Sequence, residues 1–167
     1  MNKFDEIIPK LIQICTDRNI KIATAESFTA GLIASTIASY PGASNILYAG
    51  AVTYMVEAKN QFLGIPFEFI NKFGVVSKAI SNKMASNIRR ICNTDIGIGA
   101  TGYAGPGTDA GHVFVSICYD NKLYNLEMNI NKTRNEVRET ATYAVLKKLL
   151  VLLKRWNNER RKTKSPW

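Results

Sequence analysis

The segment from Ile20 to Ala38 constrains the fold of this chain more than any other. An apolar run is followed, without a spacer, by the residues Glu26 to Gly31 and then by an apolar pattern of helical period. This order predicts a strand that turns sharply into a helix and leaves the hydroxyls of Ser27 and Thr29 at the end of the strand. The first N–H groups of a helix lack intrahelical partners, so such a turn can bind an anion or a developing oxyanion. Either hydroxyl could instead simply cap the helix.

Strand and helix patterns alternate along most of the chain. The run from Ile46 to Tyr54 is apolar and aromatic and predicts a mostly buried strand. Asp120-Asn121 separates two β-type runs and predicts a hairpin turn. We therefore expect a three-layer α/β/α fold, with helices on both faces of a mixed, mostly parallel sheet that includes a C-terminal β-hairpin. The other elements are predicted as strands at 21–25 and 95–102 and helices at 3–17, 56–63, 67–72, 78–92 and from 132.

The length of 167 residues fits one domain, which we assign to 1–155, followed by a basic, flexible tail at 156–167. The net charge is +9, and the stretch 154–167 contributes six basic residues against one acidic residue, a net +5. Such a tail could contact nucleic acid or acidic lipid, or could simply be solvated. We expect no nucleic-acid partner, because the rest of the chain offers no surface that combines basic and aromatic residues.

No apolar run approaches the roughly 18 residues that a membrane span needs, and the N-terminus does not resemble a signal peptide. We expect a cytoplasmic protein with no membrane partner. The three cysteines, Cys15, Cys92 and Cys118, are widely spaced, and His112 is the only histidine. This pattern argues against a disulfide framework or a metal site and favours buried thiols.

Ligands of open α/β sheets bind at the carboxyl ends of strands, so the loops there are candidates for one shared site. Ser27 is a weak nucleophile unless a base accepts its proton. His112 falls within a strand pattern, which leaves Lys59 as the candidate base. A position near a helix N-terminus and partial burial would lower the pKa of Lys59, although without further support an exposed surface lysine is the simpler interpretation. Tyr54 could assist, or could be a half-buried strand aromatic.

The glycine-rich loop after Thr101 suits a phosphate or a ribose, because backbone N–H groups can approach an anion where no Cβ intrudes. Its spacing matches neither the dinucleotide fingerprint nor the P-loop. Arg134 and Arg138 lie one turn apart at the start of the last helix and could clamp a phosphate. They could equally pair with Glu136 or Glu139.

Taken together, the ordered motifs resemble the CinA C-terminal domain family, the nicotinamide mononucleotide deamidases. The resemblance extends from about residue 4 to residue 153. It is carried by Thr24-Ala25-Glu26-Ser27-x-Thr29-x-Gly31, Val52-Thr53-Tyr54-x-x-Glu57-Ala58-Lys59, Gly74-Val75-Val76-Ser77, Thr101-Gly102-x-Ala104-Gly105-Pro106 and Val137-Arg138-x-x-Ala141.

The resemblance implies an amidohydrolase of pyridine nucleotide salvage, which converts nicotinamide mononucleotide to nicotinate mononucleotide and ammonia without a metal or cofactor. By position, Ser27 would be the nucleophile, Lys59 its base and Tyr54 an assisting hydroxyl. The residues expected to bind the nucleotide substrate are Glu26, Thr29, Thr101, Gly102, Gly105 and, near the phosphate, Arg138. The resemblance also implies an oligomer, and we expect a homodimer.

This chain differs from the family pattern around the expected pocket. The family usually has Cys in place of Phe28 and Gly in place of Ala30, and it commonly inserts several residues between Gly107 and Gly111. An alternative function follows from these differences: a degenerate relative that binds a nucleotide without hydrolysing it.

Overall fold

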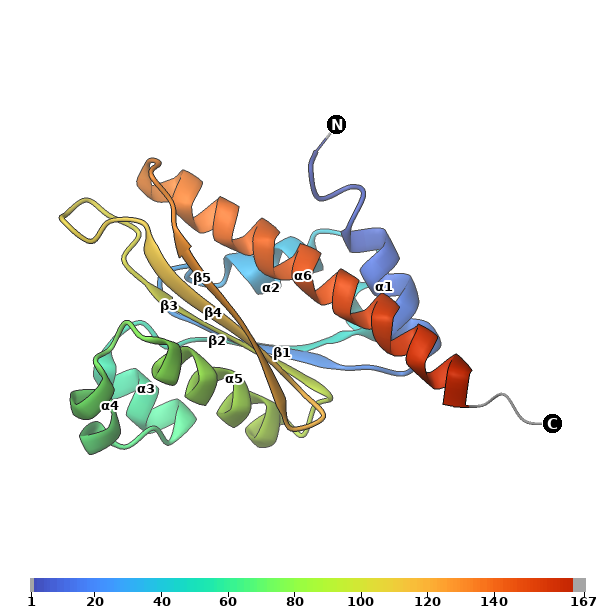
Figure 1. Cartoon of the computed structure of the whole chain (residues 1–167), viewed down its shortest axis with the longest axis horizontal. Coiled ribbons are helices and arrows are strands. Elements are labelled where there is room, and N and C mark those ends of the chain that lie inside the picture. Colours follow the sequence, from blue (N-terminus) through green and yellow to red (C-terminus); the bar gives the residue numbers. More distant parts are fainter. Residues whose placement is uncertain (1, 164–167) are drawn as a thin grey trace.

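The computed structural model describes residues 2–163, with side chains through Trp156. A five-stranded sheet lies between two layers of helices (Figure 1). The elements in chain order are α1 (Ile8–Asp17), β1 (Ile22–Glu26), α2 (Leu32–Ala38), the 3-10 turn η1 (Ala43–Asn45), β2 (Leu47–Val52), α3 (Val56–Leu63), α4 (Phe67–Phe73), α5 (Lys78–Cys92), β3 (Ile96–Gly102), β4 (His112–Tyr119), β5 (Lys122–Asn129) and α6 (Arg134–Thr163).

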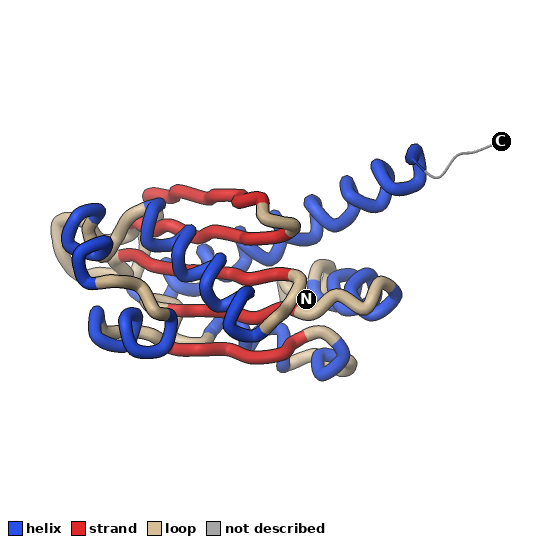
Figure 2. Tube along the Cα trace, turned by 90° about the horizontal axis from the view of Figure 1, so that it is seen from below, coloured by secondary structure: helices blue, strands red, loops and turns tan. Residues whose placement is uncertain are grey.

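The strand order across the sheet is β2-β1-β3-β4-β5 (Figure 2). β1 pairs in parallel with β2 and β3, while β4 is antiparallel to both β3 and β5. Four of the five strands therefore run in the same direction. Asp120 and Asn121 both have positive φ, 50° and 58°, as a two-residue hairpin turn between β4 and β5 requires. The predicted fold class and the C-terminal hairpin are confirmed.

The two helical layers bury separate apolar cores. α1, α2 and α6 cover one face of the sheet, and α3, α4 and α5 cover the other (Figure 1). α5 lies very close to β3: a Cβ on Gly97 would stand 2.0 Å from the carbonyl oxygen of Ala85, and one on Gly99 would stand 2.3 Å from that of Ser81. The prediction that the glycines of this strand mark a close neighbour is thus confirmed.

β2 differs from its prediction. It is an edge strand, and its side chains alternate between half-buried and exposed, with Tyr48 63% and Val52 51% exposed. Its apolar composition is that of a strand covered on both faces, but local composition does not determine a strand's place in the sheet. The expectation of a mostly buried strand at 46–54 is therefore wrong.

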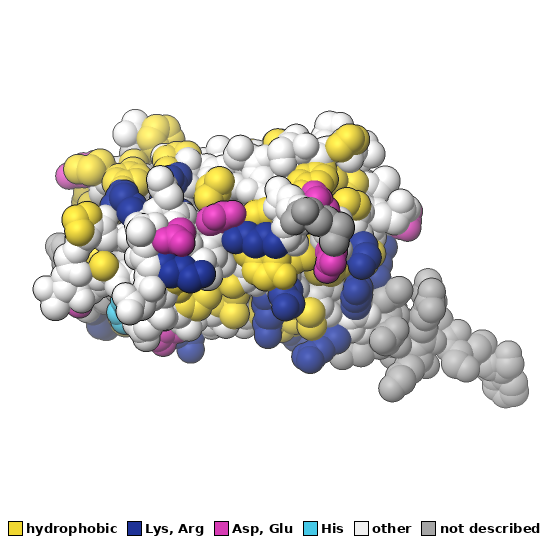
Figure 3. Space-filling model, turned by 90° about the horizontal axis from the view of Figure 1, so that it is seen from above, with side chains coloured by type: hydrophobic (Ala, Val, Ile, Leu, Met, Phe, Trp, Pro, Cys, Tyr) yellow, Lys and Arg dark blue, Asp and Glu magenta, His cyan; other side chains and the backbone are white. Residues whose placement is uncertain are grey.

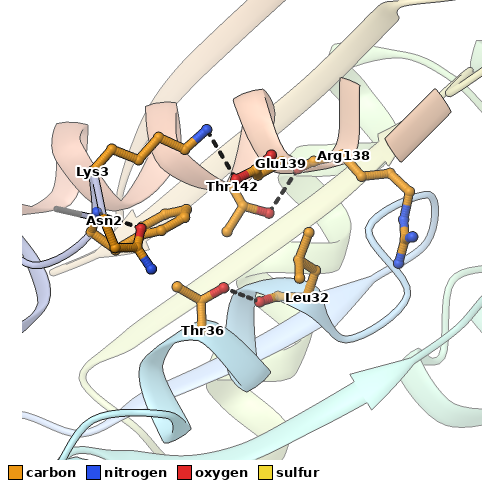
Figure 4. Close-up of polar contacts among 8 residues, drawn as sticks. Asn2, Lys3, Leu32, Thr36, Arg138, Glu139 and Thr142 are labelled. Carbon is orange, nitrogen blue, oxygen red and sulfur yellow. Dashed lines mark hydrogen bonds and ion pairs between the residues drawn. The ribbon is translucent and has the colours of Figure 1, made fainter. Parts of the chain in front are cut away.

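α6 extends beyond the predicted domain limit at residue 155, because it runs without interruption to Thr163. The tail's side chains after Trp156 lie outside the described residues, so its flexibility stays a prediction. Hydroxyls on α2 and α6 donate within their own helices, and Lys3 pairs with Glu139 (Figure 4). Within residues 2–163, no helix is both long enough and apolar enough to cross a bilayer.

Candidate active site

Glu26, the last residue of β1, holds the turn into α2. Its carboxylate accepts hydrogen bonds from the backbone N–H groups of Ile33 (3.0 Å) and Ala34 (2.9 Å) and from the hydroxyl of Thr24 (3.0 Å). Glu26 is fully buried and does not line the pocket described below. α2 has no other side-chain cap, so neither Ser27 nor Thr29 serves as the N-cap. The turn is fixed by a carboxylate, and the Ser27 hydroxyl is left available.

Lys59 lies beside that hydroxyl. It occupies the fourth position of α3, and its side chain points back over the helix N-terminus, as helical Cα–Cβ bonds do. Its Nζ is 3.2 Å from the Oγ of Ser27, and it donates to the carbonyl oxygens of Thr53 (2.8 Å) and Tyr54 (3.1 Å). Lys59 is fully buried, which excludes the interpretation as an exposed surface lysine.

Burial lowers the pKa of Lys59 from 10.5 to about 8. The cause is desolvation, which disfavours the ammonium form. No carboxylate pairs with this lysine among the described residues. A substantial fraction of Lys59 is therefore neutral near physiological pH and able to accept a proton.

Arg138 reaches the same turn from α6 (Figure 4). Its guanidinium donates to the carbonyl oxygens of Phe28 (3.1 Å) and Thr29 (3.0 Å), and also to Oδ1 of Asn135 (3.0 Å). It does not line the pocket. The structure thus places Arg138 behind the turn rather than where a substrate phosphate would lie, and it pairs with neither Glu136 nor Glu139.

Among the described residues, several backbone N–H groups of this turn have no acceptor, including two that directly follow Ser27. Ser27 N–H donates to Ala100, and Ala30 N–H donates to Ser27. Within the described part of the chain, the N–H groups of Phe28 and Thr29 have no acceptor, and the buried hydroxyl of Thr29 has no partner. The bond from Arg138 to the Phe28 carbonyl orients the peptide whose opposite end is the Thr29 N–H.

A pocket of about 420 Å³ opens beside Ser27, within the size range of small-molecule sites. It lies at the carboxyl ends of the strands and is formed by the loops after β1, β2 and β3, by the segment before α5 and by the start of α6. Its lining residues are Ser27, Phe28, Tyr54, Val75, Val76, Thr101, Gly102, Tyr103, Ala104, Gly105, Pro106 and Arg134.

Arg134 is the cationic residue of this pocket. It donates to the hydroxyl of Tyr54 (2.7 Å) and to the carbonyl oxygen of Gly105, and so connects the loops after β2 and β3. Tyr54 is 47% exposed, with its hydroxyl directed at Arg134. Of the two arginines one turn apart, Arg134 is therefore the one available to an anionic ligand.

The structure brings most of the predicted site residues together. Ser27, Tyr54, Thr101, Gly102 and Gly105 line the pocket, while Glu26, Thr29 and Arg138 support the turn from behind. Sequence reasoning did not assign the wall formed by residues 75 and 76, which a hydrogen bond from Thr101 to the carbonyl of Val75 (2.8 Å) holds against β3. The motif at 74–77 was the available signal.

The remaining reactive side chains lie elsewhere. His112 pairs with Glu127 on the hairpin, 2.9 Å away. Cys15 and Cys118 are buried, and burial raises the pKa of Cys15 to about 12, which makes its thiol inert. Within the described residues, no group of three His, Cys, Asp or Glu side chains could hold a metal ion. Independence from metals and cofactors stays a prediction.

The fold and the site define a class: three-layer α/β/α domains with a serine and a buried lysine at the carboxyl end of the first strand. The chain belongs to the CinA C-terminal domain family, whose model matches residues 5–153. A protein of Clostridium perfringens named as a competence-damage inducible protein is 37% identical over 147 residues, which are 85% of this chain and 35% of that protein.

Other relatives carry the same name. One from Clostridium beijerinckii is 38% identical over 154 residues, which are 89% of this chain and 37% of that protein. One from Listeria welshimeri is 51% identical over 96 residues, which are 58% of this chain and 23% of that protein. The chain spans about a third or less of the length of these curated relatives.

Solved structures agree with the fold over nearly their whole length. A competence or damage-inducible protein from Enterobacter asburiae has a TM-score of 0.87 at 31% identity, with 92% of this chain and 99% of that chain covered. A competence damage-inducible protein A from Klebsiella pneumoniae has a TM-score of 0.88 at 28% identity, with 93% and 99% covered. Their names state no reaction.

Proposed function

We propose that this chain is an amidohydrolase that converts nicotinamide mononucleotide to nicotinate mononucleotide and ammonia, with Ser27 as nucleophile and Lys59 as base. The single observation that supports it most is the distance of 3.2 Å between the two side chains at the edge of a pocket. The family and the motifs of the chain supply the substrate class. The contact between Ser27 and Lys59 indicates the role of each residue in catalysis.

The surroundings of Lys59 favour the role of a base. A neutral amine has two hydrogens and one lone pair, and the carbonyls of Thr53 and Tyr54 accept the two hydrogens. The lone pair is then directed at the hydroxyl of Ser27. When Lys59 is protonated, its third hydrogen points at the same oxygen, so the ammonium form has a partner for each hydrogen. The Ser27 hydroxyl itself donates to the carbonyl of Tyr54 (3.4 Å), so only a rotation of this hydroxyl hydrogen toward Lys59 is needed to pass between the two states of a proton-transfer cycle.

In the first half-reaction, the Oγ of Ser27 attacks the carboxamide carbon while Lys59 accepts the hydroxyl proton. The tetrahedral intermediate carries an oxyanion, which the free N–H groups of Phe28 and Thr29 would stabilise. Such a donor typically contributes about 3 kcal/mol. Lys59 then delivers its proton to the departing nitrogen, which leaves as ammonia.

In the second half-reaction, water attacks the acyl-enzyme, Lys59 accepts its proton, and nicotinate mononucleotide leaves as Ser27 is reprotonated. Arg134 and the backbone of the glycine loop, residues 103–111, would bind the ribose phosphate. Tyr54 would hold Arg134 through their hydrogen bond and could donate to the substrate from the same wall.

The test measures ammonia released from nicotinamide mononucleotide by the wild type and by Ser27→Ala. We expect turnover by the wild type and a loss of at least about 10³-fold in the variant. Ser35→Ala, which alters an exposed serine of α2, is the matched control and should retain full activity. Equal rates for the wild type and Ser27→Ala would refute the mechanism.

The alternative function, nucleotide binding without hydrolysis, has one specific observation in its favour. Phe28 forms part of the pocket wall, where the family usually has the smaller Cys. Calorimetry with nicotinamide mononucleotide separates the two functions, because binding without ammonia release supports the alternative and turnover eliminates it.

A further inference from the structure

A second cleft lies at the end of the sheet opposite to the Ser27 pocket. It has a volume of about 450 Å³ and is formed by the last turns of α5, the residues before β3 and the turn between β4 and β5. β3 runs from one cleft to the other, and its seven residues span about 20 Å. The residues of this hairpin cleft that carry the argument below are Asn87, Arg89, Arg90, Asn93, Asn121 and Leu123.

The charge of the hairpin cleft is positive. Arg89 and Arg90 contribute to its lining, and within the described residues no Asp or Glu does. Figure 3 shows the other face of the molecule, covered by α1, α2 and α6, where acidic side chains lie among several of the basic ones, as in the pair of Lys3 and Glu139. A concave site lined by charge of one sign attracts ligands of the opposite sign, so the hairpin cleft suits an anion.

The two arginines are not needed to end α5. Basic side chains in the last turn of a helix often bond its free carbonyl groups. Here the backbone does so, because the N–H of Asn93 donates to the carbonyls of Arg89 and Arg90, and the N–H of Thr94 donates to that of Arg89 (3.0 Å). Among the described residues, neither guanidinium bonds a carbonyl of its own helix. Their side chains are therefore available for another purpose.

Arg89 is held in place, and Arg90 is free. The Nε of Arg89 donates to the carbonyl oxygen of Asp95 (2.9 Å), and its Nη1 donates to the Oδ1 of Asn121 (3.2 Å), which leaves Nη2 without a partner in the described part of the chain. The carboxylate of Asp95 accepts instead from the backbone N–H of Lys21 (2.8 Å). Arg90 is exposed, with no hydrogen bond or ion pair to any described residue. One guanidinium is thus pre-positioned and the other can close on a ligand.

The other side chains of the cleft suit the rest of an organic ligand. The carboxamide oxygen of Asn121 is occupied by Arg89, so its two N–H hydrogens remain as donors. The carboxamide of Asn87 is used the other way: its nitrogen donates to the carbonyl of Leu63 (2.8 Å), which leaves its oxygen to accept from a hydroxyl. Leu123 is 42% exposed and supplies an apolar wall.

We propose that the hairpin cleft is a second ligand site, which binds the phosphate monoester of a small polyol, such as a sugar phosphate, with Arg89 and Arg90 on the phosphate. A phosphate monoester carries a charge of about −1.5 to −2 at pH 7 and three acceptor oxygens, which match two guanidinium groups and the Asn121 amide. A carboxylate has a single charge and two oxygens. The cleft volume is that of a small-molecule site. This proposal does not rest on the proposed function.

Nuclear magnetic resonance of the nitrogen-15-labelled whole chain, titrated with ribose 5-phosphate, tests the proposal. We expect saturable shifts of the backbone amides at 86–94 and 118–123, whether or not the amides around Ser27 also shift. Ribose, which lacks the phosphate, and acetate at the same ionic strength should produce no such shifts. Shifts confined to the Ser27 pocket, or equal shifts with acetate, would overturn the proposal.

The variant Arg90→Gln provides the second part of the test. It should raise the dissociation constant obtained from the shifts at 86–94 and 118–123 at least about tenfold, because hydrogen bonds between charged groups are lost. Arg155→Gln removes the same charge from an exposed arginine of α6 and is the matched control, which should bind as the wild type does. Unchanged affinity in Arg90→Gln, or equal weakening in both variants, would overturn the proposal. Ammonia release from nicotinamide mononucleotide tests only the Ser27 pocket, so the two proposals can fail separately.

Discussion

The turn after β1 and the glycine loop after β3 face each other across the pocket, but they are built in opposite ways. Residues 26–29 are all buried; the Glu26 carboxylate binds the first N–H groups of α2, and the side chains of Lys59 and Arg138 bind the residues between. Residues 106–110 are all exposed, and the loop depends on few bonds, such as that from Arg134 to Gly105. This difference in burial indicates two separate roles: the buried turn positions the reacting atoms, and the exposed loop determines which ligand fits.

The largest expected effect comes from Lys59→Met, which keeps the volume of the side chain and removes the base. We expect kcat/KM to fall at least about 10³-fold, because Ser27 loses its proton acceptor. Since the two residues act as a unit, Ser27→Ala/Lys59→Met should be no slower than either single variant. Steady-state ammonia release measures all three. Additive losses would contradict the Ser27–Lys59 pair, because they would mean that the two side chains act independently.

The pH profile follows from the pKa of Lys59, lowered by burial to about 8. Activity requires the neutral amine, so kcat/KM should fall about tenfold per pH unit below 8 and level off above it. The measurement is the rate of ammonia release at saturating and at low substrate concentration across this range. A profile that is flat through pH 8 would contradict the assignment of Lys59 as base.

The free energy of unfolding provides an independent test of the lowered pKa of Lys59. Lys59 binds its proton less tightly in the folded state than in the unfolded state, so the cost of the buried ammonium is fully present below pH 8. The stability of the wild type should therefore rise between pH 8 and 10.5 relative to Lys59→Met, which lacks this titration. Urea unfolding of both proteins across this window measures the difference.

Arg138→Gln should affect the turn rather than the substrate. Losing the bonds to the carbonyls of Phe28 and Thr29 frees the peptide that aims the Thr29 N–H, so we expect kcat to fall about 10- to 100-fold with little change in KM. Arg138→Lys should not restore activity, because one ammonium cannot reproduce the planar fork. A large rise in KM with kcat intact would instead place Arg138 at the substrate.

Arg134→Gln should have the smallest effect, and it should change KM where Arg138→Gln changes kcat. Arg134 lines the pocket and contacts only exposed groups, so its loss should raise KM about tenfold and leave kcat within a few-fold. Titration with inorganic phosphate as an inhibitor provides a second readout, since Arg134→Gln should weaken inhibition more than Arg138→Gln does. If phosphate inhibition were weakened equally in both variants, Arg134 would not be the phosphate-binding arginine, and the buried turn and the exposed loop would not have separate roles.

The sequence predicted the layers, the hairpin and most of the pocket, because these depend on local periodicity and on the rule that ligands bind at strand ends. It did not predict that β2 is an edge, since strand order is a tertiary property. It left Lys59 ambiguous, because the pattern of α3 does not reveal that its fourth residue is buried beside Ser27. The roles of Glu26 and Arg138 depend on contacts between elements distant in sequence, which spacing does not encode.

α6 is a single helix of 30 residues, about 45 Å long at 1.5 Å per residue. Its first turn supplies Arg134 to the ligand site, and its last turn lies far from it at the other end of the molecule (Figure 1). A fluorescent reporter or a surface tether joined after Thr163 would therefore leave the opening of the pocket free. This end of α6 is the suitable attachment point for assays on immobilised protein.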